Sequence, residues 1–250
     1  MVIKLIIKSH YVYGFAMFMV LLVVLISTAI IGDEVYTASM PLCGKCIIID
    51  AGHGGIDGGA VSDSGISEKN INLSIASSLK RLLESKGAKV IMTREEDISL
   101  HNDDNESVRN KKRSDLINRR EIVNNSGADF LISIHLNFFT SPKYKGAQMF
   151  YEINHNESKI IAETLQKSLI DNVDRGNTRR AKKLDTSKLL FDNLKIPGVI
   201  AECGFLSNRE ESVLLNTARY QLKIANALCI GILNYFNSKD PEIKSMSQGF

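Results

Sequence analysis

The sequence predicts a single α/β domain, a mostly parallel sheet flanked by helices on both faces, preceded by an N-terminal hydrophobic helix. Short apolar segments alternate along the chain with longer segments that carry apolar residues at helical spacing, an order typical of α/β proteins. The apolar segments IIID, FLISI and GVIA lack the polar alternation of half-exposed strands. We therefore expect strands that are covered on both faces.

The predicted elements follow one another from residue 46 onward. We expect strands at 46–50, 88–92, 129–135, 146–152, 188–191 and 198–202, and helices at 67–87, 114–127, 156–172, 208–216 and 218–237. In the first of these helices, Ser67 can serve as the N-cap and Gly87 as the stop signal. Residues 93–113 are polar and charged without a helical period, which indicates a long loop.

The N-terminal segment, residues 1–31, has the features of an export signal. Lys4 and Lys8 precede an uncharged apolar run over 11–31, and about 20 such residues suffice to span a bilayer as a helix. A signal-peptide core is usually shorter, about 7–15 residues, so a signal anchor is favoured over a cleaved signal peptide. We expect residues 32–44 to be a tether. The positive-inside rule then places the rest outside, anchored in the cell envelope or secreted.

Composition and charge limit the partners of the remaining chain. With 44% hydrophobic and 24% charged residues, the chain resembles an ordinary globular protein that buries a sizeable core. The formal net charge of +3 gives no large field of one sign, so we expect no nucleic-acid partner, and membrane contact only through the N-terminal segment. Residues 45–238 should form one globular domain, and residues 239–250 a polar tail.

Polar groups able to bind metal or move protons end three of the predicted strands. The first strand leads to His53, the third ends on His135, and the last ends on Glu202. Ligands of open α/β sheets bind at the carboxyl ends of the strands, so these groups should converge. Two imidazoles and one carboxylate form an ordinary catalytic zinc set that leaves one position for water. Spacing alone does not choose the carboxylate, and these candidates remain: Asp50, Asp57, Glu68 and Glu202.

Several motifs resemble those of a known family. The segments IIIDAGHGGIDGGAV, SEKNINLSIA, LISIHLN and VIAECGFLSNREE are together similar to the zinc-dependent N-acetylmuramoyl-L-alanine amidases of bacterial cell walls. Further features of that family appear as MTRE and DLINRREIVN. The resemblance covers about residues 45–237, so it implies that residues 45–238 are a zinc amidase catalytic domain.

The resemblance also implies roles for individual residues. Zinc would be held by His53, Glu68 and His135, and Glu202 would be the catalytic carboxylate. Asp50 then becomes a candidate to orient His53 by a hydrogen bond. The implied reaction is hydrolysis of the amide between N-acetylmuramic acid and L-alanine of the stem peptide, with zinc activating water and Glu202 moving the proton.

The lone catalytic domain and the N-terminal hydrophobic segment resemble the spore-cortex, germination-linked subgroup of that family. This resemblance implies that the product feeds muramic-δ-lactam formation with a deacetylase. Peptidoglycan would be the substrate, an accessory or regulatory envelope protein a partner, and the forespore or cortex space the location. Two other classes of function stay open. One is another zinc hydrolase of wall polymers, such as a deacetylase. The other is a non-catalytic wall-binding module.

Overall fold

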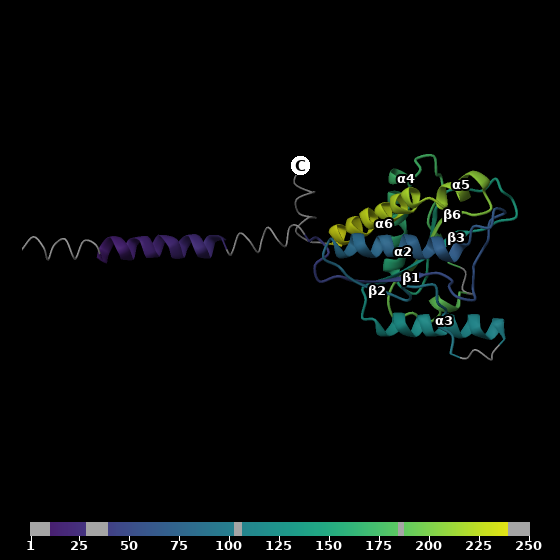
Figure 1. The fold of residues 1–250 in the computed structure, drawn as a ribbon, viewed down its shortest axis with the longest axis horizontal. Coiled ribbons are helices and arrows are strands. Elements are labelled where there is room, and N and C mark those ends of the chain that lie inside the picture. The colour runs from purple at the N-terminus through teal and green to yellow at the C-terminus, as the bar shows by residue number, and fades with distance from the viewer. Residues whose placement is uncertain (1–10, 29–39, 103–106, 185–187, 240–250) are drawn as a thin grey trace, which may run out of the picture. The chain divides into compact units, whose positions relative to one another are not determined.

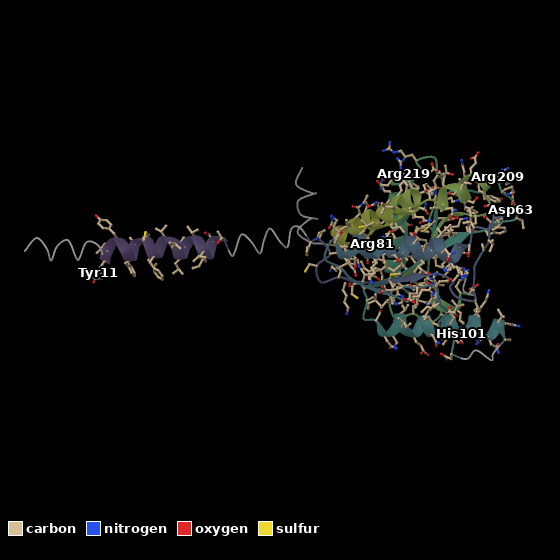
Figure 2. All side chains as sticks on the ribbon, viewed as in Figure 1. Tyr11, Asp63, Arg81, His101, Arg209 and Arg219 are labelled. Atoms are coloured by element: carbon tan, nitrogen blue, oxygen red, sulfur yellow. The ribbon has the colours of Figure 1, made fainter. Side chains whose placement is uncertain are left out.

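A computed structural model describes residues 11–28, 40–102, 107–184 and 188–239. The chain divides into two compact units, Met1–Pro41 and Leu42–Phe250. The first contains one described helix, Tyr11–Thr28, with a mean hydropathy of 2.2 and no buried residue. Its side chains project on all sides of the helix (Figure 2). This helix is long and apolar enough to cross a membrane, as predicted. Of the predicted tether the structure describes residues 40–44, where Leu42 is fully buried in the core, and of the predicted polar tail it describes Lys239.

The second unit is built on a six-stranded sheet with the order β2-β1-β3-β6-β4-β5. Its strands are β1 Cys46–Ala51, β2 Lys89–Met92, β3 Phe130–Asn137, β4 Gln148–Tyr151, β5 Lys182–Lys183 and β6 Gly198–Phe205. Neighbours among β2, β1, β3 and β6 pair in parallel, whereas β4 runs antiparallel to β6. The predicted fold class, a mostly parallel α/β sheet, is confirmed.

Helices cover both faces of this sheet (Figure 1). On one face lie α2 Glu68–Glu84, α4 Asn156–Asn172 and α6 Ala218–Lys239, which pack against one another. On the other lie α3 Val108–Asn125 and the 3₁₀ helix η1 Leu189–Phe191. The short α5 Arg209–Leu215 precedes α6.

The strand pleat divides the core into two apolar clusters. Ile47 and Ile49 of β1 belong to the cluster that contains α2, α4 and α6, whereas Ile48 packs with Val123 of α3. All three isoleucines are fully buried. The alternation follows because successive side chains of a strand point to opposite faces of the sheet. A strand covered on both sides therefore needs apolar residues at consecutive positions, which is the pattern in the sequence.

Two predicted elements differ from those observed, and one short strand was not predicted. The helix predicted from residue 114 begins at Val108, where the Ser107 hydroxyl accepts a hydrogen bond from the Asn110 amide at 3.3 Å. Its first turns are charged and exposed, so no apolar period marks them. The segment predicted as a strand at 188–191 contains the 3₁₀ helix η1, and the two-residue strand β5 was not predicted because both its lysines are exposed.

One expected cap also differs in detail. Ser67 does occupy the N-cap position of α2, but its side chain makes no capping hydrogen bond. Its hydroxyl donates instead to the Gly58 carbonyl at 3.0 Å. Ser67 therefore ties the start of α2 to the glycine-rich loop that follows β1.

The core contribution of α2 can be measured at Leu79, which is fully buried. We expect Leu79→Ala to lower the free energy of unfolding by about 2–5 kcal/mol, because the substitution removes buried surface and leaves a cavity. Urea denaturation followed by circular dichroism measures the change. Glu84→Ala, an exposed position on the same helix, is the control and should change it by less than about 0.5 kcal/mol.

Candidate active site

The site begins where β1 leaves the sheet. The Gly52 amide donates to the Ile134 carbonyl at 3.0 Å, which carries the chain alongside β3 for one more residue. A β-carbon on Gly52 would lie only 2.3 Å from Cε1 of His135. Glycine is therefore required at this position, because the imidazole of His135 lies directly against its backbone. The next residue, His53, adopts a left-handed conformation with φ of 62°.

Three side chains converge beside this turn. Glu68 Oε1 lies 3.3 Å from Nε2 of His53 and 3.1 Å from Nδ1 of His135. The two imidazole rings meet edge to face, with centroids 4.9 Å apart. One ligand atom from each residue lies within 4.8 Å of the others, so the group could hold a metal ion. Two nitrogen donors and one carboxylate oxygen are the donor set of many catalytic zinc sites.

Glu68 stands at the N-terminus of α2 and is 3% exposed. Its Oε2 accepts a hydrogen bond from the Ala60 amide at 2.8 Å, and its Oε1 accepts from the Leu136 amide at 3.0 Å and from Nδ2 of Asn72 at 3.2 Å. Burial alone would raise the pKa of Glu68, but its hydrogen bonds with the two imidazoles outweigh burial and hold the pKa well below its usual range. The side chain is thus fixed as an anion.

Asp57, and not Asp50, orients His53. Asp57 Oδ2 lies 2.7 Å from Nδ1 of His53, and Asp57 Oδ1 lies 2.7 Å from Nζ of Lys112. Burial lowers the pKa of His53, but the hydrogen bonds with Asp57 and Glu68 outweigh burial and raise it to about 9. The sequence offered Asp57 only as a possible ligand. Lys112 was not singled out, since it lies in the segment predicted as a loop.

The predicted role of Asp50 in orienting His53 is wrong. Because of the strand pleat, Asp50 points to the same face as Ile48, towards α3. Its carboxylate accepts hydrogen bonds from the Thr93 hydroxyl at 2.7 Å, the Ser133 hydroxyl at 2.6 Å and the Arg119 guanidinium at 2.8 Å. Burial alone would raise the pKa of Asp50, but Arg119 and the hydroxyls lower it to about 2.

Glu202 reaches the same place from β6. Its backbone pairs with that of His135, and its side chain lines a cavity of about 140 Å³ together with His53, His135, Lys188 and Phe191. Among the described residues, its Oε2 atom is buried and has no hydrogen-bond partner. Burial raises the pKa of Glu202. A buried carboxylate with a free oxygen, beside a possible metal site, suits proton transfer.

The four residues singled out from the sequence therefore lie together. His53 follows the end of β1 as predicted, whereas His135 and Glu202 lie within β3 and β6, which continue to Asn137 and Phe205. Glu68 is the carboxylate that stands between the imidazoles. An α/β sheet with such a group at its carboxyl edge has the architecture of an enzyme with its active site at that edge.

Comparison with known proteins gives the family. The family model described as N-acetylmuramoyl-L-alanine amidase matches residues 47–234. The chain belongs to this family of enzymes, which act on peptidoglycan.

Three individual amidases show how similar this chain is to other members of the family. The chain is 42% identical to the germination-specific N-acetylmuramoyl-L-alanine amidase of Bacillus subtilis over 204 residues, which cover 81% of this chain and 85% of that protein. It is 47% identical to the CwlD amidase of Clostridioides difficile, solved in complex with the GerS lipoprotein, with a TM-score of 0.76 over 79% of this chain and 100% of that one. An N-acetylmuramoyl-L-alanine amidase of Clostridium difficile 630 is 29% identical, with a TM-score of 0.67 over 78% and 98% of the chains.

Gly52 offers a test of the geometry. In Gly52→Ala the new methyl group must displace the His135 imidazole, so we expect binding of a divalent metal to weaken at least about tenfold. Competition with a chelator measures the affinity. Gly58→Ala is a matched control, because its β-carbon would meet nothing closer than the Ser67 hydroxyl at 3.8 Å. Equal affinities of the two variants would contradict the close approach.

Asp50 should make folding stability sensitive to acid. Its pKa is about 2 in the folded protein, whereas an unperturbed aspartate has a pKa of 3.8. Its ionised form therefore contributes about 2 kcal/mol of stability above pH 4, which is lost as the pH falls towards 2. Urea denaturation at pH 7 and pH 3 should show a smaller loss in Asp50→Asn than in the wild type. The same loss in both would argue against a depressed pKa.

Proposed function

We propose that this amidase is zinc-dependent, with His53, Glu68 and His135 as the metal ligands and Glu202 as the catalytic carboxylate. The observation that carries the proposal concerns Glu202, whose side chain lines the same cavity as the two imidazoles. Its Oε2 atom is buried and has no hydrogen-bond partner among the described residues. The donor set fits zinc, since two nitrogens and one oxygen leave a fourth position for water. The bond cleaved would be the amide between N-acetylmuramic acid and L-alanine of the stem peptide.

The bound metal and Glu202 would have separate roles in the reaction. Zinc held there would lower the pKa of water to about 7 and polarise the substrate carbonyl. Glu202 would take the proton from the attacking water and return it to the leaving amine. Its raised pKa suits the first of these steps, because the conjugate base of a weaker acid is a better proton acceptor.

Asp57 would prepare His53 for metal binding. A carboxylate only accepts hydrogen bonds, so Nδ1 of His53 carries the hydrogen that faces Asp57. The other nitrogen, Nε2, is the one that faces Glu68 and is left with a lone pair once its proton is lost. Lys112 neutralises Asp57 from the far side and limits the excess negative charge behind the ligand.

We further propose a role in spore cortex maturation, through muramic-δ-lactam formation, and in germination. The support is the 42% identity to an amidase named as germination-specific and the likeness to CwlD. The CwlD structure contains a lipoprotein, which supports an accessory envelope protein as partner. The apolar helix within residues 1–31 would serve as signal peptide or anchor, residues 32–44 as tether and 45–238 as catalytic domain, placing the enzyme in the envelope, at the forespore or cortex.

Glu202→Gln tests the catalytic assignment. The amide keeps the size of the side chain but cannot take up a proton, so we expect hydrolysis of muropeptides to fall about 10²–10⁴-fold with an unchanged metal content. Release of stem peptide, followed by chromatography and mass spectrometry, measures the rate. Glu210→Gln, at an exposed position on α5, is the control. Near-normal turnover in Glu202→Gln would overturn the assignment, and undiminished hydrolysis in chelator would overturn the zinc dependence.

The same assay separates the amidase from a deacetylase. An amidase releases free stem peptide, whereas a deacetylase releases acetate and leaves the peptide attached. A wall-binding module would release neither.

A further inference from the structure

Two arginines from the sequence features MTRE and DLINRREIVN have no role in the proposed chemistry, yet both are buried beside the site. Arg94 is 2% exposed and Arg119 is 1% exposed. Arginine is almost never fully buried unless its donors are occupied. Their hydrogen bonds therefore indicate what these two side chains do.

Both guanidinium groups bind the turn that carries His53. Arg94 donates from Nε to the Ala51 carbonyl at 2.8 Å and from NH2 to the Gly52 carbonyl at 3.0 Å. Arg119 donates from NH1 to the Ala51 carbonyl at 2.9 Å and from NH2 to the His53 carbonyl at 2.8 Å. Three consecutive carbonyls are thus fixed by two planar forks. Asn72, which also bonds Glu68, adds a donor to the Gly52 carbonyl at 3.2 Å.

The turn needs this support because its backbone is strained. His53 has a φ of 62°, a left-handed conformation that is unfavourable for residues with a β-carbon. Glycine, which would relieve the strain, cannot replace the imidazole. Such a conformation persists only where the surroundings hold it in place. The four arginine bonds to Ala51, Gly52 and His53 are contacts of that kind.

The geometry of the guanidinium group, and not its charge, explains why these residues are arginines. Arg119 is balanced by Asp50 and by Asp115, whose Oδ2 lies 2.7 Å from its Nε. Within the described part of the chain, Arg94 donates only to carbonyls, the other two being those of Lys69 at 2.9 Å and Glu96 at 2.9 Å. Two buried cations beside a possible metal site repel a third, so their charge does not favour metal binding. What they supply is a rigid fork that reaches two carbonyls at once, which lysine cannot do.

We propose that Arg94 and Arg119 are positioning residues that hold the Ala51–His53 backbone so that the His53 imidazole faces Glu68 and His135. The inference rests on the proposed metal site. It adds that metal binding requires the two arginines as well as the three ligands. Ligand geometry at His53 depends on donors from α3 and from the segment after β2. Loss of either fork lets the turn relax towards an ordinary conformation and turns the imidazole away.

The test uses the full-length protein in detergent and Arg119→Lys, which keeps the charge beside Asp50 but loses the fork. Co²⁺ is added to the metal-free protein, its visible absorption is recorded, and Zn²⁺ affinity is measured by chelator competition. We expect Zn²⁺ to bind about 10–100-fold more weakly, with an altered Co²⁺ spectrum, in protein whose circular dichroism shows that it is folded. Arg120→Lys is the matched control, because Arg120 is the next residue on α3 and pairs with Asp192 near the surface at 3.3 Å.

Arg94→Lys is the second variant, since Arg94 makes no hydrogen bond to a carboxylate of any described residue, and its loss leaves the Arg119 ion pairs in place. If either variant is unfolded in buffer, the osmolyte trimethylamine N-oxide is added to all samples to restore the folded state. A lower denaturation midpoint with unchanged Zn²⁺ affinity and Co²⁺ spectrum in both variants would overturn the positioning role. Wild-type protein that binds neither ion would instead contradict the metal site itself.

Discussion

The parallel register of β1, β3 and β6 is the constraint on which the site depends. Asp50 pairs with Ser133, and His135 pairs with Glu202 two residues further along, so these four side chains share one face of the three strands. The same face carries Ile48, Leu131 and Ile200, which are buried against α3 and η1. A slip of one residue would turn the side chains of the slipped strand to the opposite face of the sheet. The core packing that fixes the register therefore also fixes the site.

Charged side chains are concentrated around these residues, and nearly all of them pair with an opposite charge. Asp50 and Asp115 bracket Arg119, and Asp57 lies between His53 and Lys112. Such networks rarely add stability over an apolar core, but removal of one member leaves the others buried and unpaired. The network therefore acts as a unit. Arg94 and Glu202 are exceptions. Among the described residues, Arg94 donates only to carbonyls, and Glu202, for which proton transfer is proposed, has a buried oxygen without a hydrogen-bond partner.

The sequence predicted the parts of the site that regular structure delivers. His53, His135 and Glu202 follow apolar segments, and the rule that parallel strands share a carboxyl edge brings them together. Glu68 was identified only by family resemblance, since the loop before it has no period and its path depends on glycines such as Gly52 and Gly59. Asp57 was missed as the orienting group for the same reason. The start of α3 was missed because capping by Ser107, and not an apolar face, begins that helix.

The wide separation of the site residues along the chain has a consequence for the timing of folding. His135 and Glu68 are 67 residues apart, and Arg119 and Asp50 are 69 apart. Contacts of such length form slowly, because the entropy of closing long loops is lost before the contacts compensate for it. Each of these contacts also belongs to the sheet or to its α3 cover. A chain emerging N-terminus first therefore has no assembled centre until β6 joins the sheet, and hydrolytic competence arrives together with the native fold.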